Sequence, residues 1–235
     1  MQFNLTFLFQ WALSITKERL RLIKVVLVDD QDLVRTGIKL ILQDVSDFNI
    51  VNEARSGEDA VSICRKSPPD VVLMDVNMPG IGGMEATKQI CRLAENTRVI
   101  CLSQLKDEPI PSQVMQLGAH GFLTKDAEPE EVINAIYKVA AGQKYIAADI
   151  AQAMAMKSFG GANGNPFEDL SSRELDIAMR LTSGVRVPEI ANQLNISAKT
   201  VNTYRYRMFE KLGVESDVEL THLALRHKLI KTDSM

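Results

Sequence analysis

The chain has 235 residues, of which 46% are apolar, and a formal net charge of −3 at pH 7. This length is sufficient for two modest hydrophobic cores, and we interpret it as two domains. The near-neutral charge excludes a globally basic nucleic-acid-binding protein, although a locally basic surface remains compatible with it.

The first 22 residues precede the first predicted strand. Residues 1–15 are uncharged and rich in aromatic side chains, and a basic cluster follows at 17–21. That order is the reverse of a secretory signal peptide, and the apolar run is too interrupted for a membrane span. We therefore predict an N-terminal extension ahead of the folded domains, with a membrane-surface anchor as the alternative.

Between residues 23 and 142, apolar runs alternate with segments of helical periodicity. The apolar runs cover residues 24–28, 49–54, 70–74, 98–102 and 120–123. Five such repeats predict an α/β domain with a five-stranded, doubly wound parallel sheet that is covered by helices on both faces. Ligands bind in such folds at the carboxyl ends of the strands, where the strand order reverses.

Reactive side chains follow four of these apolar runs. Asp29 and Asp30 follow the first run, Asp75 the third, Ser103 the fourth, and Lys125 lies just beyond the fifth. Because the carboxyl ends of parallel strands share one edge of the sheet, we expect these five side chains to line one crevice. A single aspartate at such a position is more often a helix cap or a turn former, so the prediction depends on the whole set.

The chemistry of this set suits phosphoryl transfer to an aspartate. Magnesium prefers oxygen ligands and commonly takes one or two carboxylates. The carboxylates of Asp29, Asp30 and Asp75, with the main-chain carbonyl of Asn77, offer such ligands. We predict that Asp75 attacks phosphorus in line while Mg²⁺ and the Lys125 ammonium offset the charge of the phosphoryl group.

Residues 23–142 resemble the receiver domain of bacterial two-component response regulators. The resemblance is carried by Asp29-Asp30, Met74-Asp75-Val76-Asn77-Met78-Pro79, Leu102-Ser103 and Thr124-Lys125. It implies that Asp75 is the phosphoacceptor, that Asp29 and Asp30 bind Mg²⁺, and that Ser103, Lys125 and the aromatic Phe122 are the phosphate and switch contacts. Gln104 departs from the family pattern, because many receivers have a small residue beside the phosphoryl pocket.

Residues 143–167 are predicted to connect two domains. The stretch from Tyr145 to Phe159 has the composition of a helix rich in alanine and methionine. The run of Gly, Asn and Pro from Gly160 to Pro166 cannot continue a helix. We therefore predict a helix followed by a flexible linker.

Residues 168–230 carry the start signals of four short helices. Ser171 and Glu174 form a capping-box pattern, and Ser216 and Glu219 form a second one further on. Ser197 follows a tight turn and opens a longer helix to about residue 212. A short helix, a tight turn and a longer helix predict a helix-turn-helix within an all-α, four-helix domain.

Basic charge is concentrated on the third of these helices. From Glu168 to the end of the chain there are ten basic and ten acidic residues, whereas this helix has four basic residues against one acidic residue. A charge run on a helix is more often a solvated face, but its position after a capped turn favours the major groove of DNA. The predicted DNA contacts are Lys199, Thr200, Asn202, Thr203, Arg205, Tyr206, Arg207 and Lys211.

This second domain resembles the LuxR-type DNA-binding domain, and the whole chain resembles response regulators of the NarL/FixJ class. Segments 199–207, 209–212 and 216–220 are similar to the group of global regulators that includes GacA, UvrY and LetA. The resemblance implies a hybrid sensor histidine kinase as phosphodonor, double-stranded promoter DNA of small-RNA genes as target, and a phosphorylation-dependent homodimer. It also implies that Asn202, Thr203 and Tyr206 face base edges, with Lys199, Thr200 and Arg205 nearer the phosphates.

Two other classes of function remain open. An aspartyl phosphatase or phosphotransferase commonly has a second aspartate two positions after the nucleophile, where this chain has Asn77. A pure protein-interaction module would not need a basic recognition helix. The three cysteines and three histidines lack metal-ligand spacing, and the cysteines indicate a reducing compartment. We therefore predict a cytoplasmic regulator without enzymatic activity or a membrane span.

Overall fold

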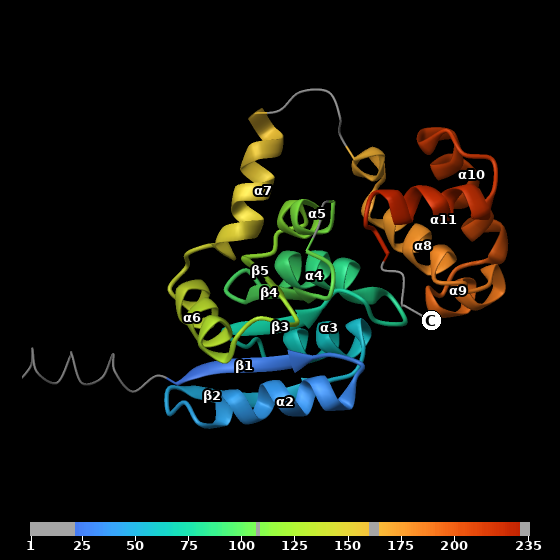
Figure 1. Cartoon of the computed structure of the whole chain (residues 1–235). Helices are drawn as coiled ribbons and strands as arrows, with labels where there is room; N and C mark the ends of the chain where they lie inside the picture. The colour runs from blue at the N-terminus through green and yellow to red at the C-terminus, as the bar shows by residue number, and fades with distance from the viewer. Residues whose placement is uncertain (1–21, 107–108, 160–164, 231–235) are drawn as a thin grey trace, which may run out of the picture.

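The computed structural model describes residues 22–106, 109–159 and 165–230 (Figure 1). The predicted N-terminal extension lies outside the described residues except for Leu22, and so does most of the Gly/Asn/Pro run. The first domain alternates strands and helices, as the apolar runs predicted. Its elements are β1 (Ile23–Val28), α2 (Asp32–Gln43), β2 (Phe48–Ala54), α3 (Gly57–Lys66), β3 (Val71–Asp75), α4 (Gly82–Leu93), β4 (Arg98–Ser103), α5 (Ile110–Gln116), β5 (Gly121–Thr124) and α6 (Pro129–Ala140).

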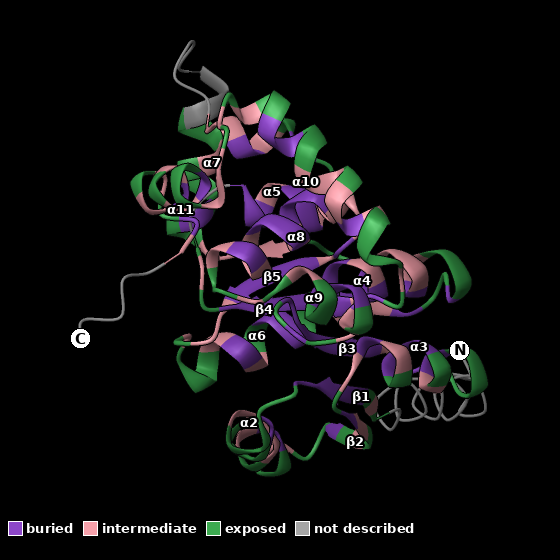
Figure 2. Cartoon of the chain, turned by 90° about the vertical axis from the view of Figure 1, so that its right-hand side faces the viewer, coloured by how far each residue is buried: buried purple, intermediate pink, exposed green. Residues whose placement is uncertain are grey.

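The strands form one parallel sheet in the order β2-β1-β3-β4-β5-β6. The chain adds β2 on one side of β1 and β3 on the other, so the strand order reverses between β1 and β3. Alternate residues of each strand enter opposite cores. Val26 and Val72 pack with α3, α4 and α5, whereas Val25 and Leu27 pack with α2 and α6. The buried strands between the two helix layers are visible in Figure 2.

The sheet has a sixth strand that the sequence did not predict. β6 (Tyr145–Ile146) pairs with β5, and α7 (Ala148–Phe159) begins only after it. The prediction of a helix from Tyr145 was therefore wrong for its first three residues. Tyr145 explains the difference, because its N–H donates to the carbonyl of His120 and its hydroxyl donates to Glu131 of α6.

The second domain consists of helices around its own apolar centre. It begins with a 3-10 turn, η1 (Pro166–Asp169), which Asn165 caps, so Pro166 starts a structured element rather than ending the linker. Ser171, Ser197 and Ser216 cap three of the helices, as predicted from the sequence. The helices are α8 (Ser172–Thr182), α9 (Val187–Gln193), α10 (Ala198–Leu212) and α11 (Asp217–Arg226).

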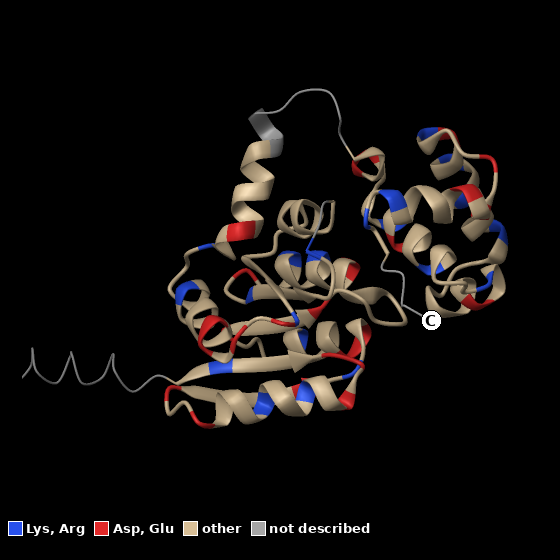
Figure 3. Ribbon diagram, in the orientation of Figure 1, with Lys and Arg blue, Asp and Glu red and all other residues tan. Residues whose placement is uncertain are grey.

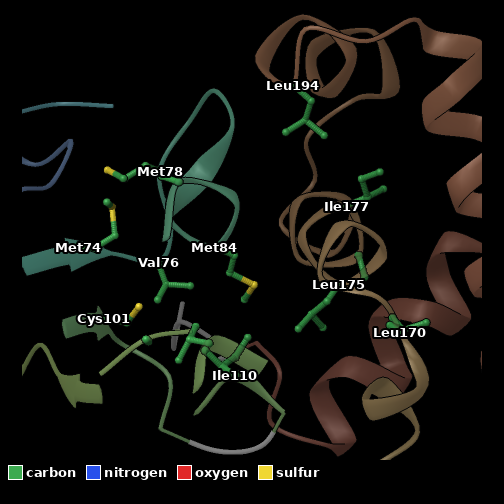
Figure 4. Packing of buried hydrophobic residues seen from close by; sticks show 14 of the residues in the cluster. Met74, Val76, Met78, Met84, Cys101, Ile110, Leu170, Leu175, Ile177 and Leu194 are labelled. Atoms are coloured by element: carbon green, nitrogen blue, oxygen red, sulfur yellow. The ribbon is translucent and has the colours of Figure 1, made fainter. Parts of the chain in front are cut away.

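The two domains are packed against each other through α8. Val76, Met84 and Ile110 of the first domain belong to the same buried cluster as Leu170 and Leu175 of the second (Figure 4). Two hydrogen bonds cross this contact, from Gln113 Nε2 to the Leu170 carbonyl (2.9 Å) and from Arg180 Nη2 to the Met78 carbonyl (3.0 Å). The second domain therefore lies against the loop that follows β3. No helix within the described ranges is long and apolar enough to cross a membrane.

Candidate functional site

Asp75 is the last residue of β3 and is fully buried. The N–H of Asn77 donates to Asp75 Oδ1 (3.0 Å), and the N–H of Val76 donates to the Leu102 carbonyl on β4 (2.9 Å). These bonds turn the chain sharply after the strand and hold the carboxylate at the switch point of the sheet. The second carboxylate oxygen, Oδ2, accepts from Lys125 Nζ at 2.8 Å.

The acidic residues at the ends of β1 and β3 meet in one cluster. Carboxylate oxygens of Asp29, Asp30 and Asp75 all lie within 4.8 Å of one another. Asp29 Oδ1 accepts from the N–H of Gln31 (2.8 Å), which leaves Oδ2 buried without a hydrogen bond. Lys125 Nζ forms an ion pair with that oxygen at 2.8 Å.

Burial and charge set the electrostatics of this cluster. Burial raises the pKa of Asp75 to about 6, although the Lys125 ammonium and the Asn77 N–H oppose the shift. Burial lowers the pKa of Lys125, but the carboxylates of Asp29 and Asp75 outweigh that effect and raise it above its ordinary value. The site thus holds more negative than positive charge, and an added cation would stabilise it.

The donor set fits a hard divalent cation. The three carboxylates offer the oxygen ligands that Mg²⁺ prefers, and the orphaned Asp29 Oδ2 is the kind of buried acceptor that a bound ion satisfies. Asp30 and Asn77 are exposed at the mouth of the site, where water can complete an octahedral shell. The described side chains therefore fit a Mg²⁺ ion by their chemistry and by their spacing.

The other predicted contacts lie on β4 and β5. Ser103 is buried at the end of β4, where its hydroxyl accepts from the N–H of Leu105 (3.0 Å) and its carbonyl accepts from the N–H of Lys125 (2.9 Å). Phe122 is fully buried on β5 and pairs with Cys101 on β4. Gln104 is exposed directly after Ser103. The structure thus brings Asp29, Asp30, Asp75, Ser103 and Lys125 to one edge of the sheet.

Sequence reasoning did not find two residues that support the site. Arg35 of α2 is buried and donates from Nη1 to the Asp29 carbonyl (2.8 Å), while Glu53 and Asp32 hold the same guanidinium. Glu58 of α3 accepts from the N–H of Ile81 (2.9 Å), in the loop after β3. Neither pairing follows from helical periodicity, because both partners come from other elements.

Glycines allow the loop after β3 to close tightly. A Cβ on Gly83 would lie 1.9 Å from the Asp75 carbonyl oxygen, which is closer than any real contact. Gly80 has a φ of +77°, and its Cβ would lie 2.5 Å from the Glu58 carboxylate. Gly80 and Gly83 are therefore required by the conformation and packing of this loop.

The predicted DNA-reading helix is α10. The residues that share its exposed side are spaced three or four apart, so they form one stripe along the helix. Thr200 and Asn202 flank this stripe and are half-buried. Basic and acidic positions are interspersed over the rest of the domain (Figure 3). The exposed stripe consists of Lys199, Thr203, Tyr206, Arg207 and Glu210.

Two of the predicted DNA contacts have partners within the domain. Arg205 forms a two-pronged ion pair with Asp217 of α11, with both N–O distances at 2.7 Å. Lys211 Nζ donates to Glu174 Oε2 (2.7 Å) and to the Asp169 carbonyl (3.1 Å). The local excess of positive charge that the sequence indicated on this helix is therefore partly neutralised in the fold.

Comparisons with known protein families match both domains. The profile of the response regulator receiver domain matches residues 25–137, and that of the bacterial regulatory proteins of the luxR family matches residues 168–224. The first match contains the phosphoacceptor candidate and its neighbours, and the second contains most of α8 to α11.

Relatives and solved structures cover most of the chain. Response regulator UvrY of Escherichia coli K12 is 52% identical over 91% of this chain and 99% of its own length. Response regulator GacA of Pseudomonas aeruginosa is 48% identical over 91% of this chain and all of its own length. A structure of RcsB from Salmonella enterica serovar Typhimurium, bound to promoter P1flhDC with the phosphomimetic BeF3⁻, has a TM-score of 0.68 and 27% identity over 87% of this chain and 98% of that chain. This chain therefore belongs to the response regulators of two-component systems, with a receiver domain followed by a DNA-binding domain of the LuxR type.

Proposed function

We propose that Asp75 is the residue of this response regulator that accepts the phosphoryl group. The observation that carries the proposal is the cluster of three carboxylates within 4.8 Å, in which the Lys125 ammonium contacts Asp29 and Asp75 at 2.8 Å each. When Asp75 attacks, the phosphorus–nitrogen bond of a donor phosphohistidine breaks and an acyl phosphate forms. The imidazole leaves with the electron pair of that bond.

The neighbouring side chains have separate roles in this proposal. Once Asp75 carries the phosphoryl group, its carboxylate charge is lost, and the Lys125 ammonium pairs with a phosphoryl oxygen instead. The Ser103 hydroxyl donates to a second phosphoryl oxygen. Asp29, Asp30, Asp75 and the Asn77 carbonyl would hold Mg²⁺, which supplies charge neutralisation at the phosphoryl oxygens when it is bound. Movement of Ser103 and Lys125 towards the phosphoryl group would change the conformation of the face that contains Phe122.

We further propose that the phosphorylated chain binds promoter DNA through α10 as a homodimer. The exposed stripe of α10 supports this role, and the related RcsB structure contains promoter DNA. Lys199, Thr200, Asn202, Thr203, Tyr206 and Arg207 are the proposed DNA contacts. Arg205 and Lys211 are instead assigned to holding α10 in the domain, because of their partners Asp217 and Glu174.

The relatives support a finer assignment as a global regulator of the kind of UvrY and GacA. On this basis the chain acts in the cytoplasm, its phosphodonor is a hybrid sensor histidine kinase, and its targets include promoters of small RNAs. The rival assignment as an aspartyl phosphatase lacks support at the second position after Asp75, where Asn77 has no acidic proton to donate. The chain then transfers the signal to DNA rather than turning over a substrate.

The decisive experiment compares wild type with Asp75→Asn. The amide cannot attack phosphorus, so the variant should take up no acid-labile phosphoryl group from a kinase or from acetyl phosphate while keeping its fold by circular dichroism. Sequencing the chromatin fragments that each form binds would then identify the phosphorylation-dependent targets. Equal labelling of the variant and wild type would refute the assignment of Asp75.

A further inference from the structure

A cavity of about 580 Å³ lies between the two domains, at the mouth of the proposed phosphoacceptor site. On the receiver side it is lined by Asp30, Asn77 and Gln104, which follow β1, β3 and β4. Its opposite wall includes Arg180 of α8 and Gln193 of α9. Anything that approaches the buried carboxylate from this side therefore enters a space whose outer wall is the DNA-binding domain.

This outer wall is fixed to the receiver by Arg180. Its Nε donates to Asp176 Oδ1 (2.8 Å) and its Nη1 donates to Gln193 Oε1 (2.5 Å), so its own domain orients the guanidinium. The remaining nitrogen, Nη2, donates to the Met78 carbonyl at 3.0 Å, one residue after Asn77. An oriented guanidinium that meets a main-chain acceptor loses little further entropy on docking, which makes this a specific attachment.

A second hydrogen bond joins the two domains at another point of the contact. Gln113 of α5 donates to the Leu170 carbonyl at 2.9 Å, in a buried position. Apolar side chains of both domains belong to one buried cluster at this contact, and Figure 4 shows Met84 and Ile110 on the receiver side with Leu170 and Leu175 on the other side. Opening the domains would expose this apolar surface and break both bonds, so the contact has a definite free-energy cost of separation.

In the docked arrangement the exposed stripe of α10 remains accessible to solvent. Lys199, Thr203, Tyr206 and Arg207 are exposed, and none of them lines the cavity. Docking thus covers the mouth of the phosphoacceptor site and leaves α10 uncovered. Its direct consequence falls on the phosphorylation step rather than on the contact with bases.

The outer wall of the cavity separates two classes of phosphodonor. An α-helix with its side chains is about 10–12 Å across, and the folded surface that presents a phosphohistidine is wider still. In the docked state Arg180 and Gln193 stand on the side of the cavity from which that surface would approach Asp30 and Asn77. Acetyl phosphate and phosphoramidate are only a few times larger than a water molecule, which takes about 30 Å³.

We propose that the docked DNA-binding domain selects the phosphodonor by size. Small phosphodonors reach Asp75 through the cavity in the docked state, whereas a phosphohistidine protein reaches it only after the domains separate. The proposal rests on the proposed role of Asp75. In each case one bond to phosphorus breaks as the aspartyl oxygen–phosphorus bond forms: phosphorus–oxygen for acetyl phosphate, with acetate leaving, and phosphorus–nitrogen for phosphoramidate or phosphohistidine, with ammonia or imidazole leaving.

The test locks the domains together in the full chain. Glu85 of α4 and Ser172 of α8 line the narrow gap between the two helices and lie outside the proposed site. The double variant Glu85→Cys/Ser172→Cys, joined with a short bifunctional maleimide, holds the docked state. Each single-cysteine variant, treated with the same reagent, is the control for modification and for the native cysteines.

Phosphorylation of the linked and control proteins is then followed with two donors, phosphoramidate and a phosphohistidine kinase that phosphorylates the unlinked chain. Linking should leave the phosphoramidate rate within about twofold and lower the kinase rate by about tenfold or more, because only the open fraction accepts a protein donor. Equal loss with both donors, or no loss with either, would overturn the proposal. Linked Asp75→Asn that still gains a phosphoryl group would refute the proposed phosphoacceptor instead.

Arg180→Ala tests the attachment from the opposite direction. It should raise the kinase rate and leave the phosphoramidate rate close to that of wild type, because the small donor does not need the open state. Arg186→Ala removes a guanidinium from an exposed position of the same domain and should change neither rate. A thermal melt confirms that both variants are folded, and a wild-type kinase rate in folded Arg180→Ala would contradict the role of this residue.

Discussion

The proposed phosphoacceptor site and the proposed DNA-reading helix, α10, differ in how their residues are held. The site residues lie at strand ends, where main-chain hydrogen bonds of a parallel sheet fix their positions. The helix residues lie on a solvent-facing surface, where a partner on a neighbouring helix decides whether a charge stays free. Arg205 and Arg207 show this, because they are two positions apart and only Arg205 is paired with Asp217.

A charge pattern in the sequence predicts a site more directly where the charges are buried than where they face solvent. In the receiver, repulsion between the buried carboxylates of Asp29 and Asp75 is poorly screened by solvent, so a cation beside them, such as the Lys125 ammonium, stabilises the cluster. On α10, water solvates each charge, and ion pairs inside the domain compete with DNA for the same side chains. The two regions should therefore respond differently to the loss of one charged group.

The largest effect is expected at the proposed Mg²⁺ site. Asp29→Ala removes a buried oxygen that has no hydrogen bond and leaves Lys125 with Asp75 alone. The Mg²⁺ concentration for half-maximal phosphorylation by phosphoramidate should rise by about tenfold or more. Asp44→Ala removes an exposed carboxylate at the end of α2 and should leave it unchanged. A Mg²⁺ titration of both variants checks this, and equal midpoints would make Asp29 purely structural.

A Cβ added to a glycine should destabilise the tightly packed loop after β3 but not the exposed surface of α2. Gly83→Ala places a Cβ 1.9 Å from the Asp75 carbonyl, so the loop must shift, at a cost of about 1–3 kcal/mol. Gly37 of α2 has nothing within 4 Å of its Cβ, and Gly37→Ala should stabilise the helix by about 0.5–1 kcal/mol. Urea unfolding of both variants provides the comparison. A Gly83→Ala variant as stable as Gly37→Ala would show that the loop is not tightly packed.

The pairing of Lys211 with Glu174 should appear as a pH-dependent stability. Burial raises the pKa of Glu174, but Lys211 and Ser171 outweigh this and hold its pKa below the ordinary range. The ionised Glu174 carboxylate therefore contributes to the free energy of unfolding above its unfolded-state pKa of about 4.3. This contribution is lost as the pH falls through its lower folded-state pKa. Lys211→Ala should cost about 1–3 kcal/mol at pH 7, and less below pH 4.

The control for that prediction is a cation on the exposed stripe. Lys199→Ala should change stability by no more than about 0.5 kcal/mol at either pH, because no described residue forms an ion pair with Lys199 within 4.0 Å. Thermal melts of both variants across pH 3.5–8 would separate the two lysines, a range chosen to span the carboxylate pKa values of about 4. Identical losses at pH 7 would argue that Lys211 has no special structural role.

Sequence reasoning succeeded where geometry is set by local rules. Apolar runs and polar residues at their ends sufficed to place Asp29, Asp75 and Ser103 at one edge, because a parallel sheet aligns its strand ends. Serine caps placed the helices of the second domain within one or two residues. The family resemblance supplied the roles of those residues, which the spacing alone does not.

The rest depends on contacts between elements far apart in the chain. β6 has two residues and exists because Tyr145 is paired with β5 and α6, a partner choice that a short run cannot reveal. The attachment of Arg180 to the Met78 carbonyl joins residues 102 positions apart. Pairing of Arg205 with Asp217 likewise requires knowing how α10 and α11 cross.

The smallest expected effects concern DNA and distinguish two arginines of α10. Arg207 is exposed and belongs to the stripe, so Arg207→Ala should weaken binding to operator and scrambled DNA alike. It should also reduce the salt slope, the slope of log affinity against log salt concentration, by about one. Arg205 is paired with Asp217 and lies over the Phe209 ring at 5.1 Å, so Arg205→Ala should leave the salt slope unchanged and lower the stability of the domain.

A double-mutant cycle makes this distinction quantitative. If the Arg205–Asp217 pair is purely structural, Arg205→Ala and Asp217→Ala should destabilise the domain by similar amounts, and the double variant should cost less than their sum. Asn202→Ala, by contrast, should reduce discrimination between operator and scrambled DNA by about 1–3 kcal/mol without changing the salt slope. Titrations at several salt concentrations, with an operator selected from random oligonucleotides, check all three variants. A salt slope that falls in Arg205→Ala as much as in Arg207→Ala would mean that DNA displaces Asp217 and recruits Arg205 on binding, which would make the ion pair a competitor of the phosphates.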